Sequence, residues 1–220
     1  MKEKYLIIGG TKGIGRAVVD QLGKERCIVL SRNESDIDNH LVCDVMHDDL
    51  PEIEGLKGIV YCPGSINLKP FHRLSKDDFL TDYSVNVIGA VRVLQHYFRV
   101  LKKNEASVVL FGTVASNQGM PFHASIAAAK GGLEALARSL AAEWAPKVRV
   151  NMVNPSLTDT PLAESLLSTD QKRENAAMRH PLKKIGTPKD IANAVVFCLE
   201  NEWLTGQTIG VDGGMSKVRV

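Results

Sequence analysis

The stretch GGTKGIG, residues 9–15, decides which fold the sequence predicts. It directly follows a short apolar run at 5–8 and opens a helical pattern. Gly9 permits a tight turn, Gly13 lets the backbone approach a pyrophosphate, and Gly15 lets the helix pack closely on the strand. The N-terminus of such a helix also attracts negative charge. The stretch therefore predicts a strand-turn-helix unit that binds a dinucleotide.

Strand and helix patterns alternate along the rest of the chain. Nearly continuous apolar runs, typical of strands buried on both faces, lie at 5–8, 27–30, 58–61, 107–111 and 148–153. Helix-period patterns lie between them and after them, at 15–23, 77–101, 125–144 and 188–201. This alternation predicts a single α/β domain over residues 1–220, a Rossmann-type doubly wound parallel sheet with helices on both faces. The connections at 32–44 and 44–64 are too short for full crossover helices.

Composition narrows the class of protein. The 220 residues suit one globular domain, and 27 basic against 25 acidic residues give a net charge of +2 without a long basic run. We therefore expect small-molecule ligands and no nucleic acid. No apolar stretch approaches the ~20 residues of a membrane helix, so we expect no membrane contact and a cytoplasmic location. The four cysteines lack C-x-x-C spacing, which favours reduced thiols and no metal site.

The end of the second predicted strand bears on cofactor choice. In dinucleotide-binding folds an acidic residue there binds the ribose hydroxyls of NAD, whereas an arginine accommodates the 2′-phosphate of NADP. The sequence has Ser31, Arg32 and Asn33 at this point, and Lys12 in the glycine loop adds a second cation. We therefore expect NADP(H) to be preferred over NAD(H). The alternative is that both cations are solvated surface charges.

The segment HASIAAAK, residues 123–130, resembles the active-site helix of the short-chain dehydrogenase/reductase family, in which a tyrosine and a lysine lie four residues apart. Lys130 matches the lysine, which binds the nicotinamide ribose. Ile126 stands at the position of the tyrosine, which exchanges a proton with the substrate. Such proton transfer contributes ~10² to 10⁴-fold to the rate, and the alkyl side chain of Ile126 supplies none of it. The resemblance therefore implies an atypical member that lacks the catalytic tyrosine.

Other parts of the catalytic set also find matches. Thr113, after the run at 107–111, matches the serine that steadies the substrate carbonyl, and Asn86 matches the asparagine of the proton relay. Asn86 has the alternative role of bending its helix. His123, with an ordinary pKa of ~6.5, is the best candidate to replace the missing acid; its alternative is a structural role, and solvent is a further proton source.

The resemblance extends from the glycine loop to Gly214. Asp44 matches the aspartate that holds the adenine amino group, although a helix N-cap is a competing role. Of the family's Asn-Asn-Ala-Gly only Gly64 is kept, and Ser156 replaces the glycine of a Pro-Gly segment. The residues expected to bind the cofactor are Gly9, Thr11, Lys12, Gly13, Ile14, Gly15, Ser31, Arg32, Asn33, Asp44, Val45, Pro63, Gly64, Lys130, Pro155, Leu157 and Thr160. The stretch 161–180 is a candidate substrate lid.

Three functions follow. The first is an NADP(H)-dependent oxidoreductase acting on a carbonyl or alcohol substrate, with Thr113, Lys130, Asn86 and His123 as its catalytic residues. The second is a non-enzymatic NADP(H)-binding sensor or regulatory subunit, favoured by the loss of the tyrosine. The third is an elimination or epimerisation that uses the bound nicotinamide differently. The resemblance also implies a homodimer or homotetramer, because residues 205–214 match a segment that packs across a two-fold axis in the family.

Overall fold

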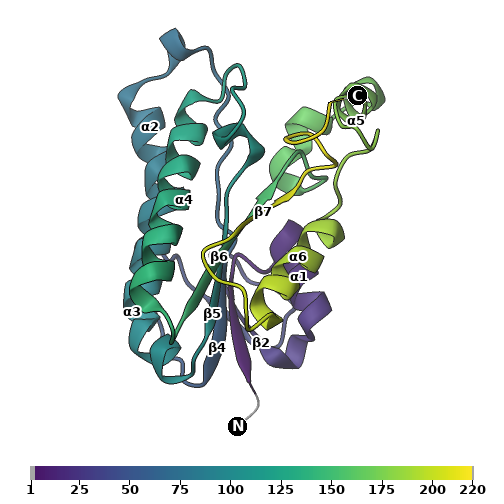
Figure 1. The fold of residues 1–220 in the computed structure, drawn as a ribbon. Coiled ribbons are helices and arrows are strands. Elements are labelled where there is room, and N and C mark those ends of the chain that lie inside the picture. The colour runs from purple at the N-terminus through teal and green to yellow at the C-terminus, as the bar shows by residue number, and fades with distance from the viewer. Residues whose placement is uncertain (1–2, 220) are drawn as a thin grey trace.

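A computed structural model describes residues 3–219 as one sheet of seven parallel strands between two layers of helices (Figure 1). The strand order is β3-β2-β1-β4-β5-β6-β7, and every neighbouring pair is parallel. The predicted fold class is therefore confirmed. The strands are β1 (Lys4–Ile8), β2 (Cys27–Ser31), β3 (His40–Val42), β4 (Leu56–Tyr61), β5 (Ser107–Phe111), β6 (Arg149–Pro155) and β7 (Thr208–Val211).

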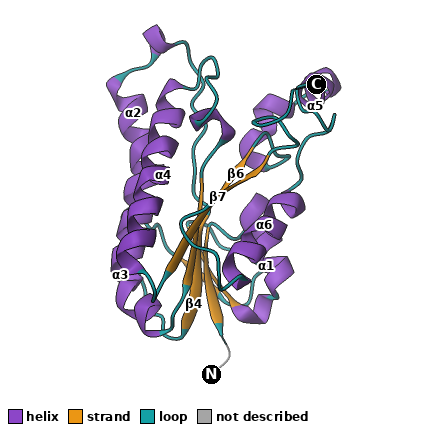
Figure 2. Cartoon of the chain, in the orientation of Figure 1, coloured by secondary structure: helices purple, strands orange, loops and turns teal. Residues whose placement is uncertain are grey.

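Helices cover both faces of the sheet (Figure 2). On one side α3 and α4 pack on the strands through Leu94 and Leu133, and α2 packs against α4. On the other side α1 and α6 pack through Val18 and Val195. The helices are α1 (Gly13–Leu22), α2 (Lys76–Tyr83), α3 (Gly89–Lys103), α4 (Ala124–Trp144), α5 (Asp170–Met178) and α6 (Pro188–Glu200).

The helical pattern predicted at 77–101 is interrupted in the structure. Its first turn begins at a capping box between Ser75 and Asp78, which satisfies two free backbone N–H groups. Between α2 and α3 the chain forms a π-helical segment, Ser84–Ile88, with Asn86 at its centre. Such wide turns occur often at functional sites. The periodicity of the apolar residues predicts a helix here but does not reveal the extra residue in its turn.

The two short connections beside β3 contain no helix, as their lengths predict. The edge strand β3 is consequently bare, and the side chains of Leu41 and Val42 are exposed. All four cysteines are free thiols. Within residues 3–219 no helix is both long and apolar enough to span a membrane.

Candidate active site

The glycine loop after β1 forms a cradle for an anion. Gly9 and Gly13 adopt positive φ values of 75° and 53°, which side chains other than glycine rarely tolerate. A Cβ atom at Gly15 would collide with the carbonyl oxygen of Gly9. The N-cap residue of α1, Lys12, makes no side-chain cap to another described residue, so the first backbone N–H groups remain available to a ligand. These features fit a pyrophosphate.

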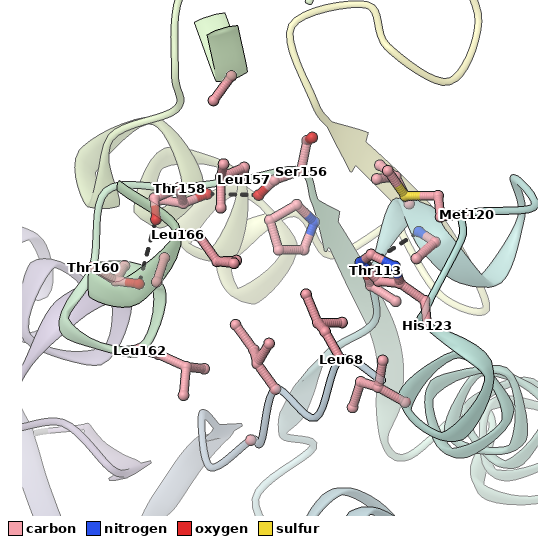
Figure 3. A pocket seen from close by; sticks show the side chains of 18 of the residues that line it. Leu68, Thr113, Met120, His123, Ser156, Leu157, Thr158, Thr160, Leu162 and Leu166 are labelled. Atoms are coloured by element: carbon pink, nitrogen blue, oxygen red, sulfur yellow. Dashed lines mark hydrogen bonds between the residues drawn. The ribbon is translucent and has the colours of Figure 1, made fainter. Parts of the chain in front are cut away.

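A cavity of about 500 Å³ opens where the loops after β4, β5 and β6 meet. The loop after β6 reaches the glycine loop, because a Cβ atom at Gly13 would lie 3.4 Å from the side chain of Thr160. Figure 3 shows Thr160 and Leu162 on one side of the cavity and Thr113 and His123 on the other. The short helical segment Pro161–Leu167 and α5 supply one wall, so the candidate lid lines the cavity.

Lys130 lies at the base of this cavity on α4, with 7% of its surface exposed. Its Nζ atom donates to the backbone carbonyl of Phe111 at the end of β5, at 2.8 Å. Burial lowers the pKa of Lys130 to about 8, and the carboxylate of Asp82 offsets part of that effect. One ammonium N–H is therefore fixed by the sheet, while the others can bind a ligand such as a ribose hydroxyl.

Asn86 is completely buried beside Lys130. Its Nδ2 atom donates to the carbonyl of Asp82 at 2.7 Å and to Ser65 Oγ at 3.0 Å. Its Oδ1 atom is buried and has no hydrogen-bond partner among the described residues. A Cβ atom at Gly64 would lie 3.4 Å from this Oδ1 and 3.8 Å from Lys130 Nζ, so the glycine keeps the space between them open. Asn86 thus both occupies a distorted helix and keeps a free acceptor.

Thr113 and His123 lie on the same side of the cavity (Figure 3). Thr113 Oγ1 accepts from the backbone N–H of Ala115 at 3.3 Å, which leaves its O–H able to donate to a substrate carbonyl. His123 Nδ1 lies 2.7 Å from the carbonyl oxygen of Pro121, an obligate acceptor, so Nδ1 carries the proton. Nε2 then remains free to exchange a proton with a ligand.

The position one helical turn before Lys130 is taken by Ile126. Its side chain lines the cavity and is 6% exposed. An alkyl group can shape the cavity there but cannot transfer a proton. Ser125, the preceding residue, is buried and does not line the cavity.

The residues expected at the adenosine end lie apart from this cavity, around the ends of β2 and β3. Ser31 Oγ donates to the carbonyl of Asn33 at 2.9 Å, which fixes the turn that presents Arg32. The side chains of Arg32 and Lys12 are exposed, and neither makes a hydrogen bond or ion pair within residues 3–219. Both cations are therefore free to meet a phosphate.

Asp44 has a local partner in the structure. Its Oδ1 atom accepts from the backbone N–H of Met46 at 2.9 Å and stabilises a turn rather than the helix N-cap considered above. Val45, next to it, is buried. Of the other residues expected to bind the cofactor, those that line the cavity with Lys130 are Ile14, Gly64, Pro155, Leu157 and Thr160.

Sequence patterns missed a buried carboxylate near the site. Asp82 is 1% exposed and accepts from Ser65 Oγ at 2.5 Å and from Ser125 Oγ at 2.6 Å. Ser65 lines the cavity and also accepts from Asn86. The network links the loop after β4, α2 and α4. The available signal was an acidic residue four positions before Asn86, on the inward face of the same helix.

A second missed group is His180, which is 3% exposed. Its Nδ1 donates to the carbonyl of Ala176 at 2.9 Å, and its Nε2 lies 2.8 Å from Ser156 Oγ. The contact between His180 and Ser156 holds the end of the candidate lid against the end of β6. Ser156, which replaces a glycine of the family pattern, supplies the hydroxyl for this contact.

The fold and the site define a member of the short-chain dehydrogenase/reductase family of oxidoreductases, and the chain belongs to that family. A family model described as "Enoyl-(Acyl carrier protein) reductase" matches residues 16–216. Carbonyl reductase family member 4 of Danio rerio is 31% identical and covers 98% of each chain. A tropinone reductase homologue of Arabidopsis thaliana is 32% identical over 96% of this chain and 74% of its own.

Among solved structures, the aldohexose dehydrogenase of Thermoplasma acidophilum superposes with a TM-score of 0.87 at 25% identity. The match covers 100% of this chain and 97% of that one. The family binds nicotinamide cofactors, and the glycine loop and Lys130 fit such a group.

Proposed function

We propose that this protein is an NADP(H)-dependent reductase of a carbonyl compound whose active site works without the family tyrosine. The observation that carries the proposal is that Thr113, Lys130 and Gly64 line one cavity, which lies next to the glycine loop. Gly64 also borders the free Oδ1 atom of Asn86. Ile126 holds the tyrosine position. The bound cofactor would supply hydride to the carbonyl carbon; the chain's own residues bind, orient and protonate.

Each residue has a part that its geometry supports. Thr113 donates its hydroxyl to the carbonyl oxygen and orients the carbonyl group. Lys130 binds the ribose through the N–H groups that Phe111 leaves free. The proton for the developing alkoxide comes from Nε2 of His123 in its imidazolium form, and the neutral imidazole left behind takes its next proton from solvent.

We further propose a preference for NADP(H) over NAD(H). Arg32 offers a planar guanidinium that matches a phosphate with two parallel hydrogen bonds, and no acidic side chain follows β2 immediately. Hydrogen bonds to charged groups contribute about 1.5–3 kcal/mol each. One such contact corresponds to ~10- to 100-fold in affinity.

The test is a fluorescence titration of the purified protein with NADPH and with NADH. We expect NADPH to bind at least ~10-fold more tightly, and Arg32→Ala to remove most of that difference while leaving NADH affinity unchanged. Arg219→Ala, at an exposed position outside the cavity, is the matched control and should change neither affinity. Failure to bind either nucleotide would refute the proposal.

The burial of Ile126 favours a second candidate, a non-enzymatic NADP(H)-binding sensor or regulatory subunit. The two candidates differ in turnover. Both require NADPH to bind, but only the reductase oxidises NADPH in the presence of carbonyl compounds. Ile126→Tyr separates them: an increase from no measurable turnover to clear carbonyl reduction would identify the parent protein as a binder with a vacated acid position. An active parent protein would identify the reductase.

A further inference from the structure

One face of α5 is turned toward the cavity. Lys172, Asn175, Ala176 and Arg179 all line it. Their spacing of three, four and seven residues places them in one stripe along a helix, with Arg179 at the C-cap. The candidate lid therefore presents two full positive charges and an amide to whatever occupies the cavity.

The charge of the cavity is one-sided. Besides Lys172 and Arg179 its lining includes Lys130 and two histidines, and none of the described residues that line it is an aspartate or glutamate. Arg173, next to Lys172 on the helix, shows the usual alternative: it points away and pairs with Asp159 at 2.8 Å. A cavity lined by charges of one sign attracts ligands of the other.

The two cationic side chains on α5 differ in their hydrogen bonds. Lys172 Nζ donates to the carbonyl of Ser165 at 3.0 Å and to Ser168 Oγ at 2.9 Å, which holds its ammonium group against the lid. The guanidinium of Arg179 makes no hydrogen bond or ion pair with another described residue. Its five N–H donors are thus available, and their fork matches a carboxylate or phosphate.

The place of Arg179 separates it from the pyrophosphate cradle. The next residue, His180, is fixed to Ser156 at the end of β6. Strands β4 and β5 lie between β6 and β1, which carries the glycine loop. Adjacent strands are about 4.8 Å apart, so the two strand ends are separated by about 14 Å. Arg179 therefore belongs to the substrate end of the cavity.

We propose that the α5 face formed by Lys172, Asn175 and Arg179 binds an acidic group of the substrate, with Arg179 as its main anchor. The substrate is then a carbonyl compound that carries a carboxylate or a phosphate. The inference rests on the proposed function for the carbonyl end, but the anion site itself requires no turnover. It predicts that charge, rather than size, decides which carbonyl compounds bind.

The test uses oxo carboxylates of increasing length between the carbonyl and the acid, each paired with its neutral amide. Binding is measured by calorimetry to protein saturated with NADP⁺, which cannot reduce them, and to protein without nucleotide. We expect at least one acid to bind ~10- to 100-fold more tightly than its amide. Arg179→Gln should abolish that preference without changing NADPH affinity. Lys189→Gln, which removes an exposed charge outside the cavity, should preserve it.

Each other outcome counts against the inference. Equal binding of acids and amides, or no acid bound at millimolar concentration, would overturn it. Weaker NADPH binding by Arg179→Gln with unchanged acid binding would assign the cation to the cofactor phosphates instead. Failure of the proposed function looks different, because the wild-type protein would then either bind no NADPH or oxidise none in the presence of carbonyl compounds. Acid binding without nucleotide would still report on the α5 face.

Discussion

Replacing Lys130 by methionine is expected to stabilise the protein at pH 7 and to weaken its binding of NADPH. Methionine has nearly the length of lysine and fills the same space without a charge. In the wild-type protein the ammonium group is 7% exposed, and burial lowers its pKa from 10.5 to about 8. At ~1.4 kcal/mol per pH unit, this difference means that keeping Lys130 charged costs about 3 kcal/mol of folding free energy.

The sign of the pH dependence follows from proton counts. Between pH 8 and 10.5 the unfolded chain keeps a proton on Lys130 that the folded protein has released. The free energy of unfolding of the wild type therefore rises with pH through this window, and the cost is fully present below pH 8. The methionine variant lacks this contribution. It also lacks the hydrogen bond to Phe111, worth ~1 kcal/mol, so we expect a net gain of about 2 kcal/mol at pH 7.

The assay is urea denaturation of wild type and variant at intervals from pH 7 to 10.5. The difference in unfolding free energy should shrink from about 2 kcal/mol and reverse near the upper end, because the wild type gains about 3 kcal/mol. Lys189→Met, at an exposed position, should show a flat difference. A flat difference for Lys130→Met as well would mean that its ammonium is hydrated and would refute the reasoning. In parallel, NADPH affinity of Lys130→Met should fall ~10-fold or more.

Three further outcomes are expected. Asp82→Ala should lower the unfolding free energy by about 3 kcal/mol in denaturation, because two buried serine hydroxyls lose their acceptor; Asp82→Glu measures how much of that loss is charge and how much is fit. Gly15→Ala should abolish NADPH binding in the fluorescence titration because its Cβ would displace the loop backbone at Gly9, and unchanged affinity would contradict the cradle. His123→Gln should leave NADPH affinity unchanged and lower kcat for carbonyl reduction ~10²-fold or more, and an unchanged kcat would exclude His123 as the proton donor.

The fold could be predicted because its determinants are local. The glycine loop, the continuous apolar strands and the short connections beside β3 each lie within a few residues of one another in the sequence. The meeting of Thr113 and Gly64 also follows from the sequence pattern, because parallel strands deliver the residues after their ends to one edge. These parts of the prediction required only the order of the elements along the chain, and no knowledge of which side chains touch in the folded protein.

The parts that escaped prediction depend on tertiary pairing. Asp82, Ser65 and Ser125 come from three segments and make sense only when α2, α4 and the loop after β4 are packed together. His180 and Ser156 are likewise separate in sequence and joined in space. The role of Asp44 also escaped prediction. Because no helix follows β3, its carboxylate accepts from the backbone N–H of Met46 in a turn and does not cap a helix.

The buried ammonium of Lys130 bears on what this site is built to do. In a site with a tyrosine the lysine has two roles, since it lowers the tyrosine pKa and binds ribose. In the proposed function, Lys130 next to Ile126 keeps only the second role. A charge that lowers folding stability by about 3 kcal/mol is retained at the base of the cavity, with its free N–H groups directed at ligand space beside an unbonded Asn86 oxygen. The proposed nucleotide binding, which both the reductase and the sensor require, would account for that arrangement.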